Sequence, residues 1–176
     1  SVLISKNLKE IKSSTHIVLP GQGAFSTCMS GLRKTNGLIE ELHDFAILRK
    51  RPFLGICVGM QMLAKDSEEN GIHKGLGWID GNIKPLPKEN LKMPHMGWNL
   101  VTPVNSNNNL IKGSEDFYFV HSYYFKCQKK EDIMAETQYG INFTSIVAKE
   151  NIYGVQFHPE KSSSQGLNLI KNFLKL

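Results

Sequence analysis

The sequence predicts an α/β protein with an open, mostly parallel sheet that is flanked by helices and carries an added antiparallel portion. In the first 65 residues, short apolar segments alternate with amphipathic segments, which is the rhythm of a parallel sheet with helices on its faces. Beyond residue 65, strand-like segments separated by turn residues follow one another, and this favours antiparallel pairing. A length of 176 residues without a repeat or linker predicts a single domain over 1–176.

The elements expected in the first part of the chain follow from periodicity. We expect strands at 2–4, 17–19 and 53–56, and helices at 7–13, 37–50 and 58–65. In the helix at 37–50, apolar side chains recur at Leu38, Leu42 and Phe45, which gives it one buried face.

The later elements are read in the same way. Strands are expected at 78–87, 97–104, 117–120, 123–127, 133–137, 143–149 and 152–157. A helix should end the chain, with Leu167, Ile170 and Leu174 on its apolar face, joined by Leu169 and Phe173.

Composition excludes several classes of protein. Hydrophobic residues make up 40% and charged residues 21%, which is ordinary for a soluble globular protein, and no apolar run is long enough to span a membrane. The net charge is +5, but the lysines are scattered, so we expect no nucleic-acid partner. Three cysteines are too few for a disulfide framework, and the first twelve residues lack the apolar core of a signal peptide, so we expect a cytoplasmic protein.

The segment Gly55-Ile56-Cys57-Val58-Gly59 has the form of a nucleophile elbow with cysteine in place of serine. It lies where a buried strand meets a helix, and such a turn exposes the nucleophile in a strained backbone. We expect the amides at the helix start to favour the Cys57 thiolate, and the Val58 amide to stabilise an oxyanion. The alternative is a buried, inert cysteine, as we expect for Cys28 and Cys127.

A cysteine nucleophile needs a base and a group that orients the base. Among six histidines, His158 directly follows an apolar strand, so it would reach the same carboxyl edge of the sheet as Cys57. Glu160 is close enough in sequence to bond one imidazole nitrogen. The alternative is a solvated surface loop. His16 and His43 have no functional setting, no group has metal-ligand spacing, and we assign no metal and no cofactor.

The loop Pro20-Gly21-Gln22-Gly23 allows three interpretations. Its glycines could let backbone amides form an oxyanion hole beside Cys57. It could instead cradle a phosphate, although the Walker-type Lys-Ser/Thr ending is absent. It could also be an ordinary loop before a helix capped by Ser26. The loop alone does not choose between them.

Together, the loop at 20–23, Gly-Ile-Cys-Val-Gly-Met-Gln at 55–61 and Gly-Val-Gln-Phe-His-Pro-Glu-Lys-Ser at 154–162 resemble the class I, triad-type glutamine amidotransferases, which have a flavodoxin-like fold. Within that class, Met60, Pro-His-Met-Gly-Trp-Asn at 94–99 and Phe-Tyr-Phe-Val-His-Ser-Tyr at 117–123 resemble the glutaminase subunits of imidazole glycerol phosphate synthase, an enzyme of histidine biosynthesis.

The resemblance implies a role for each matching position. Cys57 would attack the side-chain amide of glutamine, His158 would move protons and Glu160 would orient it. The oxyanion would be held by Gly21, Gln22 and Val58. The remaining assignments are substrate-binding residues Gly23, Gln61, His121, Ser122 and Tyr123, and partner-facing residues Met96, Trp98, Asn99 and Lys161. The partner would be a (β/α)₈ cyclase that uses the ammonia to make imidazole glycerol phosphate and an aminoimidazole carboxamide ribotide.

The chain departs from the family pattern in two respects. The family has a first strand and helix before the segment that matches Val2, so we expect this chain to lack them, and Gln22 stands where valine is usual. Two other functions stay open at this point. The chain could supply ammonia to a different synthase, such as one that amidates a surface sugar, or it could be a binding subunit without catalysis.

Overall fold

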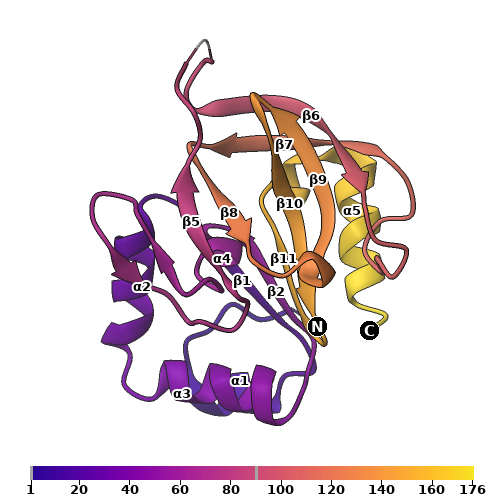
Figure 1. Ribbon diagram of the computed structural model, residues 1–176. Coiled ribbons are helices and arrows are strands. Elements are labelled where there is room, and N and C mark those ends of the chain that lie inside the picture. Colours follow the sequence, from indigo (N-terminus) through magenta and orange to yellow (C-terminus); the bar gives the residue numbers. More distant parts are fainter. Residues whose placement is uncertain (1, 90) are drawn as a thin grey trace.

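The computed structural model describes residues 2–89 and 91–176, which form an 11-stranded sheet with helices at its sides (Figure 1). The helices are α1 (Leu8–Ser13), α2 (Phe25–Lys34), α3 (Leu38–His43), α4 (Val58–Gln61) and α5 (Ser163–Phe173). The strands are β1 (Ile17–Gly21), β2 (Phe53–Cys57), β3 (Asp66–Ser67), β4 (His73–Lys74), β5 (Gly81–Pro85), β6 (His95–Pro103), β7 (Glu115–His121), β8 (Tyr123–Cys127), β9 (Ile133–Tyr139), β10 (Ile141–Lys149) and β11 (Ile152–Val155).

The main sheet runs in the order β1-β2-β11-β10-β8-β5-β3-β4, while β9 joins β10 to β6, and β6 pairs with β7. Strands β1, β2 and β11 are parallel to one another, and most of the later pairings are antiparallel. In Figure 1, α1, α2 and α3 lie on one side of the molecule and α5 on the other, while the β6–β7 hairpin crosses the top. The predicted fold class is confirmed, with an antiparallel portion larger than the sequence indicated.

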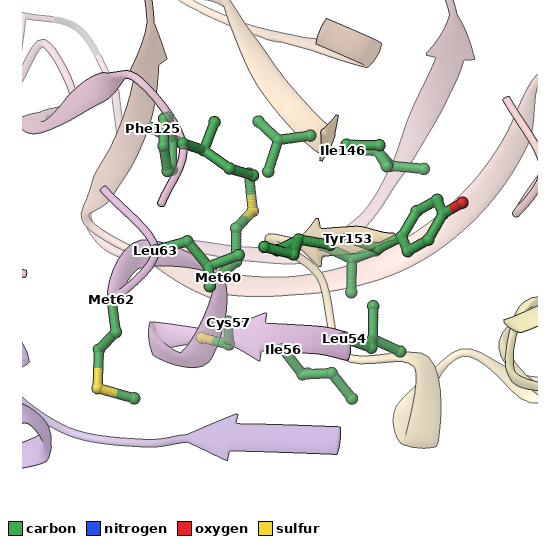
Figure 2. Close-up of a cluster of buried hydrophobic side chains, with 14 of the residues drawn as sticks. Leu54, Ile56, Cys57, Met60, Met62, Leu63, Phe125, Ile146 and Tyr153 are labelled. Carbon is green, nitrogen blue, oxygen red and sulfur yellow. The ribbon is translucent and has the colours of Figure 1, made fainter. Parts of the chain in front are cut away.

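The core forms around β2 and α4. All five residues of β2 are buried, as expected for a strand between two parallel neighbours. Figure 2 shows Met60 reaching from α4 toward Phe125 and Ile146, which come from the antiparallel portion. Gly154 on β11 permits this path, because a Cβ there would lie 2.7 Å from Cγ of Met60.

Two predicted elements are wrong. Residues 2–4 form no strand, and Val2 and Ile4 are fully solvent-exposed instead of pairing with β1. The helix predicted at 58–65 ends at Gln61. The carbonyl groups of residues 62–64 accept hydrogen bonds from the backbone amides of residues 76–79, so they are not free to continue the helix.

Three further expectations need correction in detail. The helix predicted at 37–50 is α3 followed by a π-helical segment, Asp44–Leu48. In α5 the buried side chains are Leu169 and Phe173, whereas Leu167 and Leu174 are exposed, so the helix is rotated relative to the predicted face. Helix α2 starts at Phe25, and its first amide donates to Glu69 with no cap from Ser26.

No helix within residues 2–89 and 91–176 combines the length and the apolar character needed to cross a membrane.

Candidate active site

The parallel register of β2 and β11 brings the two residues of the expected catalytic pair to one edge of the sheet. Val155 of β11 lies beside Ile56 of β2, so both strands finish at the same level. Cys57 ends β2, and His158 follows shortly after β11. Both residues line one cavity of about 350 Å³. Its other lining residues are Gln22, Gly23, Val58, Gln61, Glu69, Pro94, Val120, His121, Ser122, Tyr123 and Lys161.

The glycines around Cys57 allow the turn from β2 into α4 to pack against β1. Cys57 itself has a φ of 55° and a ψ of −114°, a backbone conformation that is unfavourable for a residue with a side chain. A Cβ on Gly59 would overlap the carbonyl oxygen of Leu19 on β1, and one on Gly55 would lie 2.7 Å from the amide nitrogen of Met60. The predicted elbow is therefore present, and the two glycines are required by close backbone contacts.

The Cys57 thiol is protonated in this state of the protein. Burial raises its pKa to about 11, which outweighs the lowering by the Val58 backbone amide. The amide at the helix start favours the thiolate, as expected, but its effect on the pKa is smaller than that of burial, because α4 is a single turn and Cys57 is 5% exposed. Attack by Cys57 therefore requires that a neighbouring base remove the proton.

His158 is held as such a base would be. Its Nδ1 lies 2.7 Å from Oε1 of Glu160. This nitrogen therefore carries the ring proton and donates a hydrogen bond to the carboxylate. Its Nε2 is buried and has no hydrogen-bond partner among residues 2–89 and 91–176. The ring is fixed from behind, because the His158 amide donates to the Tyr118 carbonyl and the Ser162 hydroxyl donates to the His158 carbonyl.

The glycine loop lies at the other side of the nucleophile. A Cβ on Gly21 would lie 2.7 Å from the amide nitrogen of Gly59, so the loop backbone packs directly on the first turn of α4. The Cys28 thiol donates to the Gln22 carbonyl at 3.3 Å. Gly23 has a φ of 89°, which favours glycine. Gln22 and Gly23 of the loop border the cavity, and Gly23 can do so only through its backbone, as two of the three interpretations require.

A carboxylate that the sequence analysis missed also borders the cavity. Glu69 lies in the turn between β3 and β4, and its Oε2 accepts the backbone N–H of Phe25 at 2.6 Å. This bond ties the turn to the start of α2, next to the glycine loop. No local motif marked Glu69, because its role depends on a contact 44 residues away.

Buried amides connect the nucleophile with the far side of the cavity. Nε2 of Gln61 donates to the Tyr123 carbonyl at 3.1 Å and to Oε1 of Gln156 at 3.0 Å. Nε2 of Gln156 in turn lies 3.8 Å from Sγ of Cys57. The same Tyr123 carbonyl accepts from Nδ1 of His121 at 2.8 Å. Gln156 is fully buried, and the sequence analysis assigned it no role.

His121 belongs to a buried pair with His95. Nδ1 of His95 lies 2.8 Å from Nε2 of His121, and Nε2 of His95 lies 3.2 Å from the Asn99 amide nitrogen. Burial lowers the pKa of His95 to about 4 and that of His121 to about 3, so both rings are neutral near pH 7. Both ring nitrogens of His121 already form hydrogen bonds within the protein, so the ring can contact a substrate only through its carbon atoms.

The residues expected to face a partner divide over two faces of β6. Met96 and Trp98 are 61% and 53% exposed and lie on one face together with exposed Leu100. Asn99 lies on the other face, where its amide nitrogen donates to the Gln138 carbonyl at 3.0 Å. Lys161 is exposed at the rim of the cavity.

A sequence model of "Glutamine amidotransferase class-I" matches residues 2–176. The chain belongs to the class-I glutamine amidotransferase family. Among curated relatives, "Imidazole glycerol phosphate synthase subunit HisH" of Pelagibacter ubique is 45% identical over 180 residues, covering 100% of this chain and 86% of the relative. The protein with the same name from Rhodospirillum rubrum is 42% identical, with 99% and 84% covered.

Solved structures of other amidotransferases share the fold. A structure described as a glutamine amidotransferase superposes with a TM-score of 0.74 at 17% identity, covering 97% of this chain and 83% of the other. The glutaminase domain of Trypanosoma brucei CTPS, solved with bound acivicin, gives a TM-score of 0.62 at 18% identity, covering 96% and 74%. In this amidotransferase, therefore, the elbow, the histidine and the glycine loop occur within a fold that the family shares.

Proposed function

We propose that this amidotransferase is the glutaminase subunit of imidazole glycerol phosphate synthase, which hydrolyses glutamine and passes the ammonia to a cyclase in histidine biosynthesis. One observation carries the proposal. Cys57 and His158, about a hundred residues apart, line one cavity, and Glu160 holds the imidazole with its unpartnered Nε2 available as a base. Similarity over the full chain to subunits of that synthase supports the choice of pathway.

In the first half-reaction, Nε2 of His158 takes the proton from the Cys57 thiol while Sγ attacks the side-chain carbonyl carbon of glutamine. The C–N bond then breaks as His158 returns the proton to the leaving nitrogen. The products are ammonia and a γ-glutamyl thioester on Cys57. Glu160 stabilises the imidazolium that forms between these two proton transfers.

In the second half-reaction, His158 removes a proton from water, which attacks the thioester carbonyl. The C–S bond breaks, Cys57 recovers its proton and glutamate leaves. We assign stabilisation of the oxyanion in both steps to the Val58 amide and to the backbone of Gly21 and Gln22. Val58 and Gln22 border the cavity, and Gly21 packs on the first turn of α4. A peptide rearrangement in the loop would be needed to aim its amide.

The cavity offers groups that match the ends of glutamine. Both N–H groups of Gln61 are engaged by protein atoms, so Gln61 can only accept a hydrogen bond from the substrate. The carboxylate of Glu69 suits the α-ammonium group. Gly23, Ser122 and Tyr123 border the same space, and His121 contributes its ring surface.

We propose that the partner is a (β/α)₈ cyclase and that it docks on the exposed face of β6. Met96 and Trp98 supply apolar surface there, and Lys161 at the cavity rim supplies a charge. Asn99 acts from the inner face of the same strand. A sealed contact is needed because ammonia that escapes into neutral water becomes ammonium. The cysteine nucleophile must stay reduced, which suits the cytoplasm.

The test is Cys57→Ala in the complex with the cyclase. Glutamine hydrolysis should disappear, whereas partner binding and ammonia-dependent synthesis should remain. His43→Asn, on the exposed surface of α3, serves as the control and should leave turnover unchanged. Normal glutaminase turnover in Cys57→Ala would refute the assigned nucleophile.

A further inference from the structure

One buried polar side chain contacts the nucleophile but does not line the cavity. Gln156 is fully buried between β11 and His158, and its Nε2 lies 3.8 Å from Sγ of Cys57. It does not border the cavity, so a bound glutamine would not touch it. Its function must therefore concern the sulfur itself or the packing around it.

The orientation of this amide is set by a carbonyl group on another strand. The Tyr123 carbonyl can only accept, so the side-chain atom of Gln61 that faces it must be the nitrogen. The same Nε2 faces Gln156, so the atom of Gln156 at 3.0 Å must be the oxygen. The nitrogen of Gln156 is then the atom that faces Sγ of Cys57.

We propose that Gln156 is a further catalytic residue, whose amide N–H donates to the Cys57 sulfur and stabilises its thiolate, and that Gln61 is the positioning residue that keeps this amide turned the right way. The proposal deepens the proposed glutaminase function and rests on it. A thiolate accepts a hydrogen bond far better than a thiol does, so the contact strengthens as the proton leaves.

The same geometry directs the proton of the thiol. Because an N–H occupies one side of the sulfur, the S–H bond is favoured on another side. Nε2 of His158 is a buried acceptor without a partner in the described part of the chain, and His158 borders the same cavity as Cys57. Gln156 thus assists the transfer to His158 in two ways, by orienting the thiol in the resting state and by holding the sulfur after the proton has left.

The experiment measures the reactivity of Cys57 toward iodoacetamide in the full chain, between pH 7 and 9, with peptide-resolved mass spectrometry. Below the pKa of the thiol, the alkylation rate is proportional to the thiolate fraction. In Gln156→Met, which keeps the length of the side chain without its donor, we expect the Cys57 rate to fall about tenfold at each pH. Alkylation of Cys28 and Cys127 in the same sample should not change.

Gln61→Glu provides a second test that leaves Gln156 in place. The carboxylate cannot donate to the Gln156 oxygen, so the Gln156 amide should turn over and present its oxygen to the sulfur. We again expect a lower Cys57 rate. If Gln156→Met shows no cooperative unfolding transition, it has not folded, and Gln61→Glu then tests the proposed role of Gln156. Gln138→Met, at an exposed position of β9, is the control and should react like the native chain.

Turnover in the complex with the cyclase adds a second readout. Because Gln156 does not touch the substrate, Gln156→Met should lower kcat about tenfold and leave KM nearly unchanged. Unchanged Cys57 alkylation in both folded variants would overturn the proposal, and a decrease in Gln156→Met alone would overturn the role of Gln61. Alkylation requires neither glutamine nor a partner, so it succeeds or fails independently of the proposed glutaminase function.

Discussion

At the carboxyl edge of β2 and β11, Cys57 and His158 are 5% and 3% exposed, whereas on the outer face of β6, Met96 and Trp98 are more than half exposed. The first region is parallel, tightly packed through glycines, and fixed by contacts to the backbone. The second is antiparallel and alternates buried with exposed side chains. Within one sheet, parallel pairing provides the protected edge that the proposed chemistry needs, and antiparallel pairing leaves one face of β6 exposed.

The largest contrast is expected in the reaction rate. His158→Gln removes the free Nε2 base, so glutamine turnover in the complex should fall about a thousandfold, within the usual contribution of a positioned base. Trp98→Ala should weaken assembly while leaving the turnover of the fully assembled complex near normal. Steady-state kinetics at saturating cyclase separates the two. Equal losses of turnover in both variants would erase the functional distinction between the regions.

The two faces of the β6–β7 hairpin should differ in stability. Phe119→Ala creates a cavity in the core and should lower the free energy of unfolding by about 4 kcal/mol. Trp98→Ala should lower it by only about 1 kcal/mol, because Trp98 is exposed and loses mainly its edge contact with Tyr118. Urea denaturation of the isolated subunit measures both values. A similar loss for Trp98 would place that side chain in the core.

The glycine contacts can be tested by adding one methyl group. In Gly59→Ala, the new carbon overlaps the Leu19 carbonyl, so the free energy of unfolding should fall by about 3 kcal/mol. Gly31→Ala in α2 is the matched control. Outside its own helix backbone, the added carbon meets no atom of the described residues within 4 Å, so this variant should stabilise the helix by about 0.5–1 kcal/mol. Thermal unfolding of the two variants should shift in opposite directions.

The buried histidine pair makes the antiparallel region sensitive to acid. The folded-state pKa of His121 lies at about 3, below that of the unfolded chain, so the unfolded state takes up the proton first as the pH falls. Stability is full above pH 6.5 and should decrease by about 2 kcal/mol by pH 5 through this group. Urea denaturation at the two pH values measures the decrease. Amide exchange should rise in β6 and β7 before β2, and uniform exchange would contradict this order.

The features of the site that could be predicted are those encoded by a short stretch of sequence. The elbow around Cys57 and the pair His158 and Glu160 are encoded by glycine spacing and by an apolar strand before a histidine, and the structure brings them together. The substrate-side residues came from a resemblance to a family and not from physical reasoning. Neither route assigned a role to Glu69 or Gln156, because each acts through a contact with a distant segment.

The wrongly predicted helix end and helix face also result from contacts with distant segments. Residues 62–65 have helical periodicity, but their carbonyl groups accept hydrogen bonds from the backbone amides of residues 75–79, and a local sequence window does not include this competing segment. In and just after α5, Leu167 and Leu174 are as apolar as Leu169, but the side of the helix that carries Gly166 packs closely against the Pro159 carbonyl, so Leu169 is buried and the other two are exposed. Burial of the sulfur likewise outweighed the helix start at Cys57.

The alternation along β6 has a consequence for insertions and deletions. Asn99 bonds inward to the histidine pair, while its neighbours Trp98 and Leu100 point outward. Because side chains on a strand change sides at every residue, losing one residue before Trp98 would exchange these roles. The indole would then point into the buried polar cluster and the amide into solvent. The hairpin therefore tolerates changes of residue type on its outer face far better than any change in its length.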